Sequence, residues 1–282
     1  MSFKKIASLT SENIFSLIYH NLFEYPLTTL ELIKWRPGKE FNKLKIQKIG
    51  YGYLNGFFYV KSNKGLIFSR VVRKRNSLKK IKIAREVSKF LKRIPFVKLV
   101  AITGSLSMFN AKDSSDIDLM VVTRKGRLWT TRFLSIILLI LYGFNVRRWG
   151  DKNEKNKICI NMWLDETNLT WPKKERNFYT AHEIAQLMPL FDKQNTYQNI
   201  LNNNLWIKEY WPNSVKIEKN KRHYKYIRPN KLESLIERLF YKSQRFYMNN
   251  KRTREVISSN KAIFHPIDRS IIIKSRLEEY FK

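Results

Sequence analysis

Residues 100–123 read VAITGSLSMFNAKDSSDIDLMVVT and contain two apolar runs joined by a polar segment. Gly104 and Ser105 follow the first run, while Asp116 and Asp118 alternate with apolar residues at the start of the second. Short apolar runs bounded by turn residues predict two β-strands. Side chains two positions apart on a strand lie on the same face, so Asp116 and Asp118 are expected to project together.

Two neighbouring carboxylates repel each other, and without a cation the pKa of one of them rises. Mg²⁺ removes this repulsion because it binds a few carboxylates together with phosphate oxygens and water. A Gly-Ser pair between a strand and a helix lets backbone N–H groups approach a phosphate closely. We therefore expect Asp116 and Asp118 to hold Mg²⁺ or Mn²⁺, and Gly104 and Ser105 to hold the phosphates of a nucleotide. An Asp pair without the Gly-Ser motif would indicate only surface acids at a strand edge.

These residues resemble the nucleotidyltransferase domain of the DNA polymerase beta superfamily. The shared motif is Gly-Ser, a spacer, and Asp-hydrophobic-Asp-hydrophobic, and the similarity covers residues 97–164. More loosely, the whole chain is similar to bacterial proteins that combine a winged-helix-like part with such a domain. The resemblance implies Mg²⁺, a nucleoside triphosphate with ATP as first candidate, and transfer of a nucleoside monophosphate to an acceptor hydroxyl with release of pyrophosphate.

Active members of the superfamily carry a third carboxylate on the following strand. Here Asn161 takes that position, within KICINMWL at residues 157–164. Asn can coordinate a metal through its carbonyl oxygen but cannot accept a proton from the acceptor. Asp165 is expected to assist catalysis only if the site lies near its end of the strand. A nucleotide-binding protein without transfer activity, acting as a regulatory or nucleic-acid-binding module, is therefore the alternative. The acceptor stays open between a small molecule, RNA and protein.

The whole sequence predicts an α/β (α+β) protein in which a mixed sheet is covered by helices. Strands are expected at 96–103, 116–123 and 157–164, and a buried helix at 127–144. The expected parts are a winged-helix-like module over 1–72, a connecting helix over 73–95, the nucleotidyltransferase core over 96–170, and a helical C-terminal region over 171–282.

The two outer parts are predicted from apolar spacing and turn residues. Helical spacing over 11–35 breaks at Pro26, residues 41–56 can form a third helix, and β-rich runs flank a hairpin turn at 62–65. Three helices followed by a hairpin are typical of a winged helix, which docks to proteins as well as to nucleic acid. The C-terminal helices are expected at 180–192, 201–211 and 232–256.

The chain is strongly basic, with 55 Lys and Arg against 23 Asp and Glu and a formal net charge of +32. This charge indicates a polyanionic partner such as nucleic acid, bound by the basic face of 73–94 or the run at 215–231. An A+T-rich genome, which favours Lys, Asn, Ile and Tyr, explains the same composition, and both interpretations stay open. The 282 residues are 43% hydrophobic, which argues against a disordered chain.

Membrane and compartment signals are few. The uncharged stretch at 133–144 is too short to span a bilayer, although flanking arginines leave a membrane-surface role open. The single Cys159 cannot form an intramolecular disulfide, and residues 1–15 lack the features of a secretory signal. A cytoplasmic protein is expected. The oligomeric state is not predicted.

Overall fold

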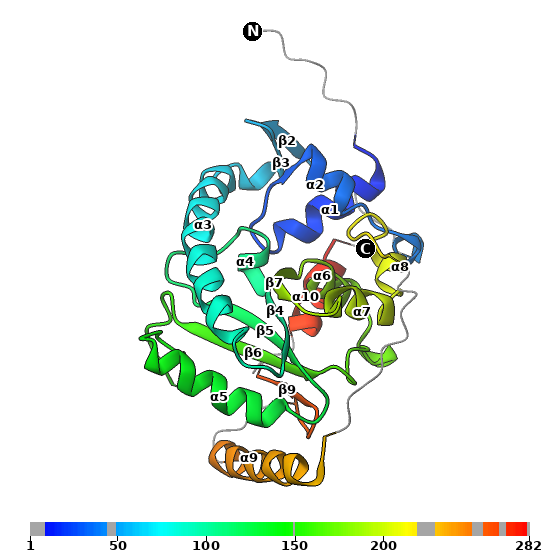
Figure 1. The fold of residues 1–282 in the computed structure, drawn as a ribbon. Helices are drawn as coiled ribbons and strands as arrows, with labels where there is room; N and C mark the ends of the chain where they lie inside the picture. Colours follow the sequence, from blue (N-terminus) through cyan, green and yellow to red (C-terminus); the bar gives the residue numbers. More distant parts are fainter. Residues whose placement is uncertain are drawn as a thin grey trace.

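A six-stranded mixed sheet lies at the centre of the fold (Figure 1). The computed structural model describes residues 9–43, 49–148, 150–218, 229–249, 256–264 and 269–280. The strand order is β7-β4-β5-β6-β9-β8, in which β5 and β6 are parallel and every other neighbouring pair is antiparallel. The strands are β4 (Val97–Ile102), β5 (Ile117–Thr123), β6 (Ile158–Asp165), β7 (Met188–Asp192), β8 (Val256–Ile257) and β9 (Lys261–Ile263).

The three strands expected from apolar runs, β4, β5 and β6, are confirmed and form the middle of the sheet. Every residue of β4 is buried, and in β5 only Asp118 is not. Parallel strands need a crossover connection, which α5 (Leu128–Leu141) supplies between β5 and β6. The expected helix is therefore present, but only one of its faces is buried.

Helices cover both faces of the sheet, and each face has its own apolar core. On one face, α3 (Leu66–Leu91) and α5 pack against alternate residues of β5 such as Leu119 and Val121. On the other face, Met120 and Val122 pack with the N-terminal part and with α6 (Phe178–Ala185). Because side chains alternate along a strand, Asp118 lies on this second face.

Among its described residues, the N-terminal part comprises two α-helices, two 3₁₀ helices and a small antiparallel sheet in the order β1-β3-β2. Its elements are α1 (Ser11–Asn21), β1 (Leu27–Thr28), α2 (Thr29–Lys34), the 3₁₀ helix η1 (Lys39–Lys43), β2 (Tyr51–Leu54), β3 (Phe57–Val60) and the 3₁₀ helix η2 (Lys61–Asn63).

Two N-terminal predictions are wrong in their placement. Tyr51–Leu54 is strand β2 and not the end of a third helix; residues 44–48 lie outside the described ranges. The hairpin turns at Asn55-Gly56 and not at 62–65, because both residues take positive φ (51° and 85°), as a two-residue turn between twisted strands requires. The long helix α3 consequently starts at Leu66.

The C-terminal part is not purely helical, which corrects the prediction for 171–282, because it supplies three strands to the central sheet. The helix expected over 180–192 ends at Ala185, and Met188–Asp192 pairs with β4 as an edge strand. Pro189 explains the break, since proline cannot continue a helix but is accepted in an edge strand. The remaining helical elements are α4 (Gly104–Ser107), η3 (Lys173–Glu175), α7 (Thr196–Asn203), α8 (Ile207–Tyr210), α9 (Lys231–Asn249) and α10 (Arg269–Glu278).

Two further sequence predictions concern the basic run at 215–231 and a membrane-spanning helix. Most of the basic run at 215–231 falls in the undescribed range 219–228. Within the described ranges, none of the helices has both the length and the apolar character needed to cross a bilayer.

Candidate active site

A cavity of about 1090 Å³ opens on the face of the sheet that carries Asp118. It is lined by five of the six predicted site residues, namely Gly104, Ser105, Asp116, Asp118 and Asn161. Residues of α1 and the segment that follows it, of α6 and of α10 form the other walls. The volume lies just above the roughly 300–1,000 Å³ of small-molecule ligand sites, so the cavity has room for a ligand of that size. Segments far apart in the sequence therefore meet around the Asp pair.

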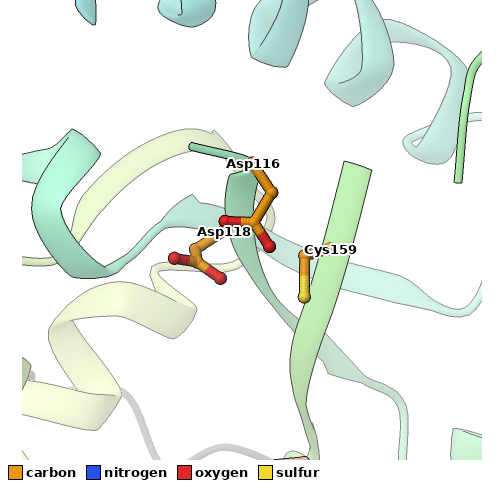
Figure 2. Close-up of side chains that lie close together, drawn as sticks. All are labelled: Asp116, Asp118 and Cys159. Atoms are coloured by element: carbon orange, nitrogen blue, oxygen red, sulfur yellow. The ribbon is translucent and has the colours of Figure 1, made fainter. Parts of the chain in front are cut away.

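Asp116 and Asp118 lie together at the start of β5. Figure 2 shows both carboxylates beside Cys159 of β6, and one ligand atom from each of the three residues lies within 4.8 Å of the others. The parallel pairing of β5 and β6 places Asp118 opposite Cys159. Burial raises the pKa of the Cys159 thiol, so this sulfur stays protonated and is a poor ligand for a hard cation.

The two carboxylates have different partners. Arg147 donates from Nη1 to Asp116 Oδ2 at 2.5 Å and also pairs with Glu154. Asp118 accepts a hydrogen bond from Asn161 Nδ2 at 2.6 Å. Burial, followed by the charge of Asp116, raises the pKa of Asp118 to about 7 against the opposing charge of Arg147. The repulsion expected from the sequence is thus, after burial, the second cause that raises the pKa of Asp118.

The donor set fits Mg²⁺. Asn161 Oδ1 is buried and has no hydrogen-bond partner among the described residues, although Nδ2 of the same amide contacts Asp118. Two carboxylates and an unpartnered amide oxygen are the hard oxygen ligands that this ion prefers. A buried polar oxygen without a partner costs free energy, and a bound cation would remove that cost.

Gly104 is required by backbone conformation and by space. Its φ is +60°, in the left-handed region that favours glycine. A Cβ at this position would lie 2.9 Å from Asp118 Oδ2, closer than a carbon and an oxygen atom can approach. Ser105, the next residue, is exposed and lines the cavity. The Gly104 backbone thus lies directly against the Asp118 carboxylate.

Asp165 is not part of the site, which corrects the expectation that it assists. On the parallel pair β5–β6 it lies opposite Thr123, whereas Asp118 lies opposite Cys159. Asp165 is six positions after Cys159, which places it about 20 Å along the strand from Cys159. Its carboxylate accepts hydrogen bonds from the backbone N–H of Thr167 at 2.8 Å and of Gly126 at 3.2 Å. Asp165 therefore stabilises the loops that follow β5 and β6.

The sequence did not reveal Glu183 or Arg269, which line the same cavity. Glu183 Oε1 accepts a hydrogen bond from Gln186 Nε2 at 2.6 Å. Burial raises the pKa of Glu183 to about 7; the charge of Arg269 opposes this rise, and that of Asp118 adds to it. Glu183 belongs to the sequence HEIAQ, whose only local signal was its partial likeness to a zinc-protease helix.

The histidine of that sequence has a structural role. His182 Nε2 lies 3.1 Å from His20 Nε2, and the ring stacks on Trp35 at a centroid distance of 4.0 Å. Burial lowers the pKa of both histidines, so both rings are neutral near pH 7. The pair joins α1 to α6 and thereby holds two walls of the cavity together.

Comparison with known protein families gives no match for this chain, and comparison with curated proteins finds no similar sequence. The function of the cavity is therefore inferred from its residues.

Proposed function

We propose that the chain is a Mg²⁺-dependent nucleotidyltransferase, which moves a nucleoside monophosphate from a nucleoside triphosphate to an acceptor hydroxyl and releases pyrophosphate. The observation that carries the proposal is the cavity lined by Gly104, Asp116, Asp118 and Asn161, in which Gly104 lies against Asp118 and the buried amide oxygen of Asn161 has no partner among the described residues. This arrangement combines a close backbone approach for phosphate with a ligand set for Mg²⁺. ATP is the first candidate for the nucleotide.

Asp116, Asp118 and Asn161 Oδ1 would hold the ion, and the backbone of Gly104 and Ser105 the β- and γ-phosphates. When bound, Mg²⁺ neutralises phosphate charge and polarises the phosphate oxygens. The protein supplies positioning and a charged environment, which account for most of the rate of phosphoryl-type transfer. Arg147 adds a positive charge beside Asp116.

Glu183 is the residue that we assign as general base. Asn161 cannot take a proton from the acceptor hydroxyl, and Asp165 is too far away. Glu183 lines the cavity with Asp116 and Asp118, and its pKa of about 7 suits proton transfer near neutral pH. The proton of the acceptor hydroxyl would pass to the Glu183 carboxylate as the hydroxyl oxygen attacks the α-phosphorus and pyrophosphate leaves.

The charges of the cavity favour a small acceptor over a nucleic-acid strand. Six acidic side chains line it, out of 23 in the chain, against six of the 55 basic side chains. The acidic ones are Glu24, Asp116, Asp118, Glu154, Glu175 and Glu183, and the basic ones are Arg73, Lys112, Arg147, Lys174, Lys261 and Arg269. A nucleic-acid strand is normally bound along a surface with a clear excess of positive charge.

The N-terminal part, predicted to be winged-helix-like, is assigned an internal docking role. The buried residues of α1 include Phe15 and Tyr19, whose rings lie 4.8 Å from Phe178 and 5.1 Å from Trp211. Phe23 and other residues that follow α1 line the cavity. The module therefore closes the site against the C-terminal part.

Label transfer in cell extract tests the proposal. The purified protein is incubated with extract, Mg²⁺ and each α-labelled triphosphate in turn, and products are sorted by nuclease and protease digestion. We expect Mg²⁺-dependent label in a product resistant to both treatments. Tight Mg²⁺-dependent nucleotide binding without transfer to any product would instead support the second candidate, a nucleotide-binding regulatory protein, which Asn161 in place of a carboxylate favours.

Gly104→Ala should weaken nucleotide binding more than it weakens folding. The left-handed φ costs alanine about 1 kcal/mol, and the new Cβ also displaces the Asp118 carboxylate. Gly143→Ala is the matched control, because Gly143 has a φ of +75° but no atom within 4 Å of the position that an alanine Cβ would take. Thermal melting with and without Mg²⁺-ATP measures both effects. Equal nucleotide stabilisation of the two variants would contradict the assignment of Gly104.

Asp165→Ala, unlike Gly104→Ala, should weaken folding more than it weakens nucleotide transfer. Loss of its hydrogen bonds to Thr167 and Gly126 is expected to lower the free energy of unfolding by about 1–3 kcal/mol. Nucleotide transfer by the folded variant should stay within a few-fold of wild type, since Asp165 does not reach the cavity. Urea unfolding and label transfer at a temperature where both proteins are folded check this. A large loss of nucleotide transfer would show that Asp165 does belong to the site.

A further inference from the structure

The helix α9 has an unusual distribution of polar and apolar residues. Its face toward the protein carries Glu237, which accepts hydrogen bonds from the backbone N–H groups of Trp129 at 2.7 Å and Thr130 at 2.9 Å and so caps the start of α5. On the same side, Glu233 pairs with Arg127 at 2.5 Å. Both acidic side chains of α9 thus form hydrogen bonds or ion pairs within the protein.

The opposite face of α9 is apolar and exposed. Leu232, Leu235, Leu239 and Phe246 recur at helical spacing and are 65%, 64%, 65% and 85% exposed. A helix of a water-soluble domain normally turns its apolar stripe inward and its charges outward. In α9 the arrangement is reversed, which indicates that the outer face contacts something other than water.

The apolar surface continues onto α5, which lies beside α9 (Figure 1). The rings of Phe133 on α5 and Phe240 on α9 are 4.5 Å apart. The outer side of α5 is formed only by apolar residues that are 37–76% exposed, namely Phe133, Leu134, Ile137, Ile140 and Leu141. We call these residues, together with the exposed face of α9, the α5–α9 surface. Contiguous apolar surfaces of this kind mark interaction sites.

The exposed charges on the two helices of the α5–α9 surface have one sign. Lys231, Arg238, Lys242 and Arg245 are exposed on α9, and its two acidic residues, Glu233 and Glu237, are engaged on the inner side. α5 contains one charged residue, Arg132. Apolar side chains bordered by cations match the boundary between the acyl chains and the anionic headgroups of a bilayer.

We propose that the α5–α9 surface lies on an anionic lipid bilayer, with the apolar residues of both helices inserted at headgroup depth and the α9 cations on lipid phosphates. This attachment is peripheral, because no helix of the described ranges is suited to crossing the membrane. A second copy of the chain is a poorer occupant, since each copy carries a net charge of +32 and the same cations would face each other across a symmetric interface. The inference does not depend on the proposed nucleotidyl transfer.

Co-sedimentation of the full chain with vesicles of phosphatidylcholine, with and without phosphatidylglycerol, tests the proposal. We expect binding to the phosphatidylglycerol vesicles that weakens with added salt, and little binding to the neutral ones. The triple variant Leu235→Ser, Leu239→Ser, Phe246→Ser should bind these vesicles at least about tenfold more weakly, because less apolar area can insert into the bilayer. Its melting temperature should hardly change, since all three side chains are exposed.

The matched control is the double variant Leu30→Ser, Phe68→Ser, whose parent side chains are 78% and 77% exposed but lie outside the α5–α9 surface. It should bind vesicles like wild type. The proposal is overturned if wild type binds neither vesicle, if it binds both equally, or if the triple variant binds like the control. It is also overturned if wild type forms a dimer, or a complex with another protein, that the triple variant cannot form, because that partner would then cover the surface.

Discussion

The double variant Asp116→Asn, Asp118→Asn should lose Mg²⁺-dependent nucleotide transfer, with kcat/KM lower by about a thousandfold or more, while staying folded. The two carboxylates supply the negative charge of the proposed ion site, and asparagine keeps their size and one oxygen but not the charge. Label transfer measures the loss. The melting temperature of the variant should also become insensitive to Mg²⁺-ATP, which stabilises wild type by binding only the folded state.

The same carboxylates should oppose folding when no cation is present, and Asp118 should account for most of this effect. Its pKa rises from 3.8 to about 7 on folding, so the folded state holds the proton more tightly than the unfolded state. Its contribution therefore makes the protein less stable as the pH rises from about 4 to about 7, with no further change above that.

Single variants separate the two residues. Asp118→Asn removes the buried charge and keeps an oxygen that can accept from Asn161, so at pH above 7 it should be more stable than metal-free wild type, and near pH 4 it should not. Asp116→Asn loses the ion pair with Arg147 and should gain nothing. Urea unfolding across this pH range measures both. An Asp118→Asn variant that is less stable than metal-free wild type, yet keeps the same Mg²⁺-ATP stabilisation, would contradict the metal site.

Glu183→Gln should lower kcat by about a hundredfold to ten-thousandfold, the usual contribution of a general base, while Mg²⁺-ATP still stabilises the protein. The glutamine retains the size of the side chain but cannot take a proton. In wild type, kcat/KM, which reflects the free enzyme, should rise with pH through about 7 as Glu183 and Asp118 lose their protons, and the part of this rise that is due to Glu183 should be missing in the variant.

Glu175→Gln is the control for this experiment, because Glu175 also lines the cavity but is exposed. It should keep both the activity and the pH profile of wild type. If Glu183→Gln transfers nucleotide at nearly the wild-type rate, the base is another group. If it loses Mg²⁺-ATP stabilisation as well as activity, Glu183 acts in nucleotide binding or in folding and not in proton transfer.

The middle of the sheet and half of the site were predictable because their signals are local. Strands β4, β5 and β6 are short apolar runs, and the Gly-Ser and Asp-x-Asp spacing places four site residues within fifteen positions of each other. The hairpin at Asn55-Gly56 also has a local signal, which outweighs the helical spacing around it.

The remaining part of the site depends on tertiary contacts that spacing does not encode. Glu183 reaches the cavity because α6 packs on the face of the sheet opposite α3 and α5, and Arg269 because α10 contacts α6. The sequence left open whether Asp165 lies near the site, because its distance along the strand was known, but not which end of the strand faced the cavity. The parallel register of β5 and β6 decides that question, and it is set by the crossover through α5.

The walls of the cavity come from both ends of the described chain, since His20 and Arg269 line it together. During synthesis the ribosome therefore releases the Asp pair long before the segment that completes the cavity around it. A nascent chain that lacks α10 leaves that wall open to solvent, so full nucleotide affinity should arise only after α10 has emerged. Proteolytic removal of α10 from the finished protein should likewise admit water and favour hydrolysis of the triphosphate over transfer.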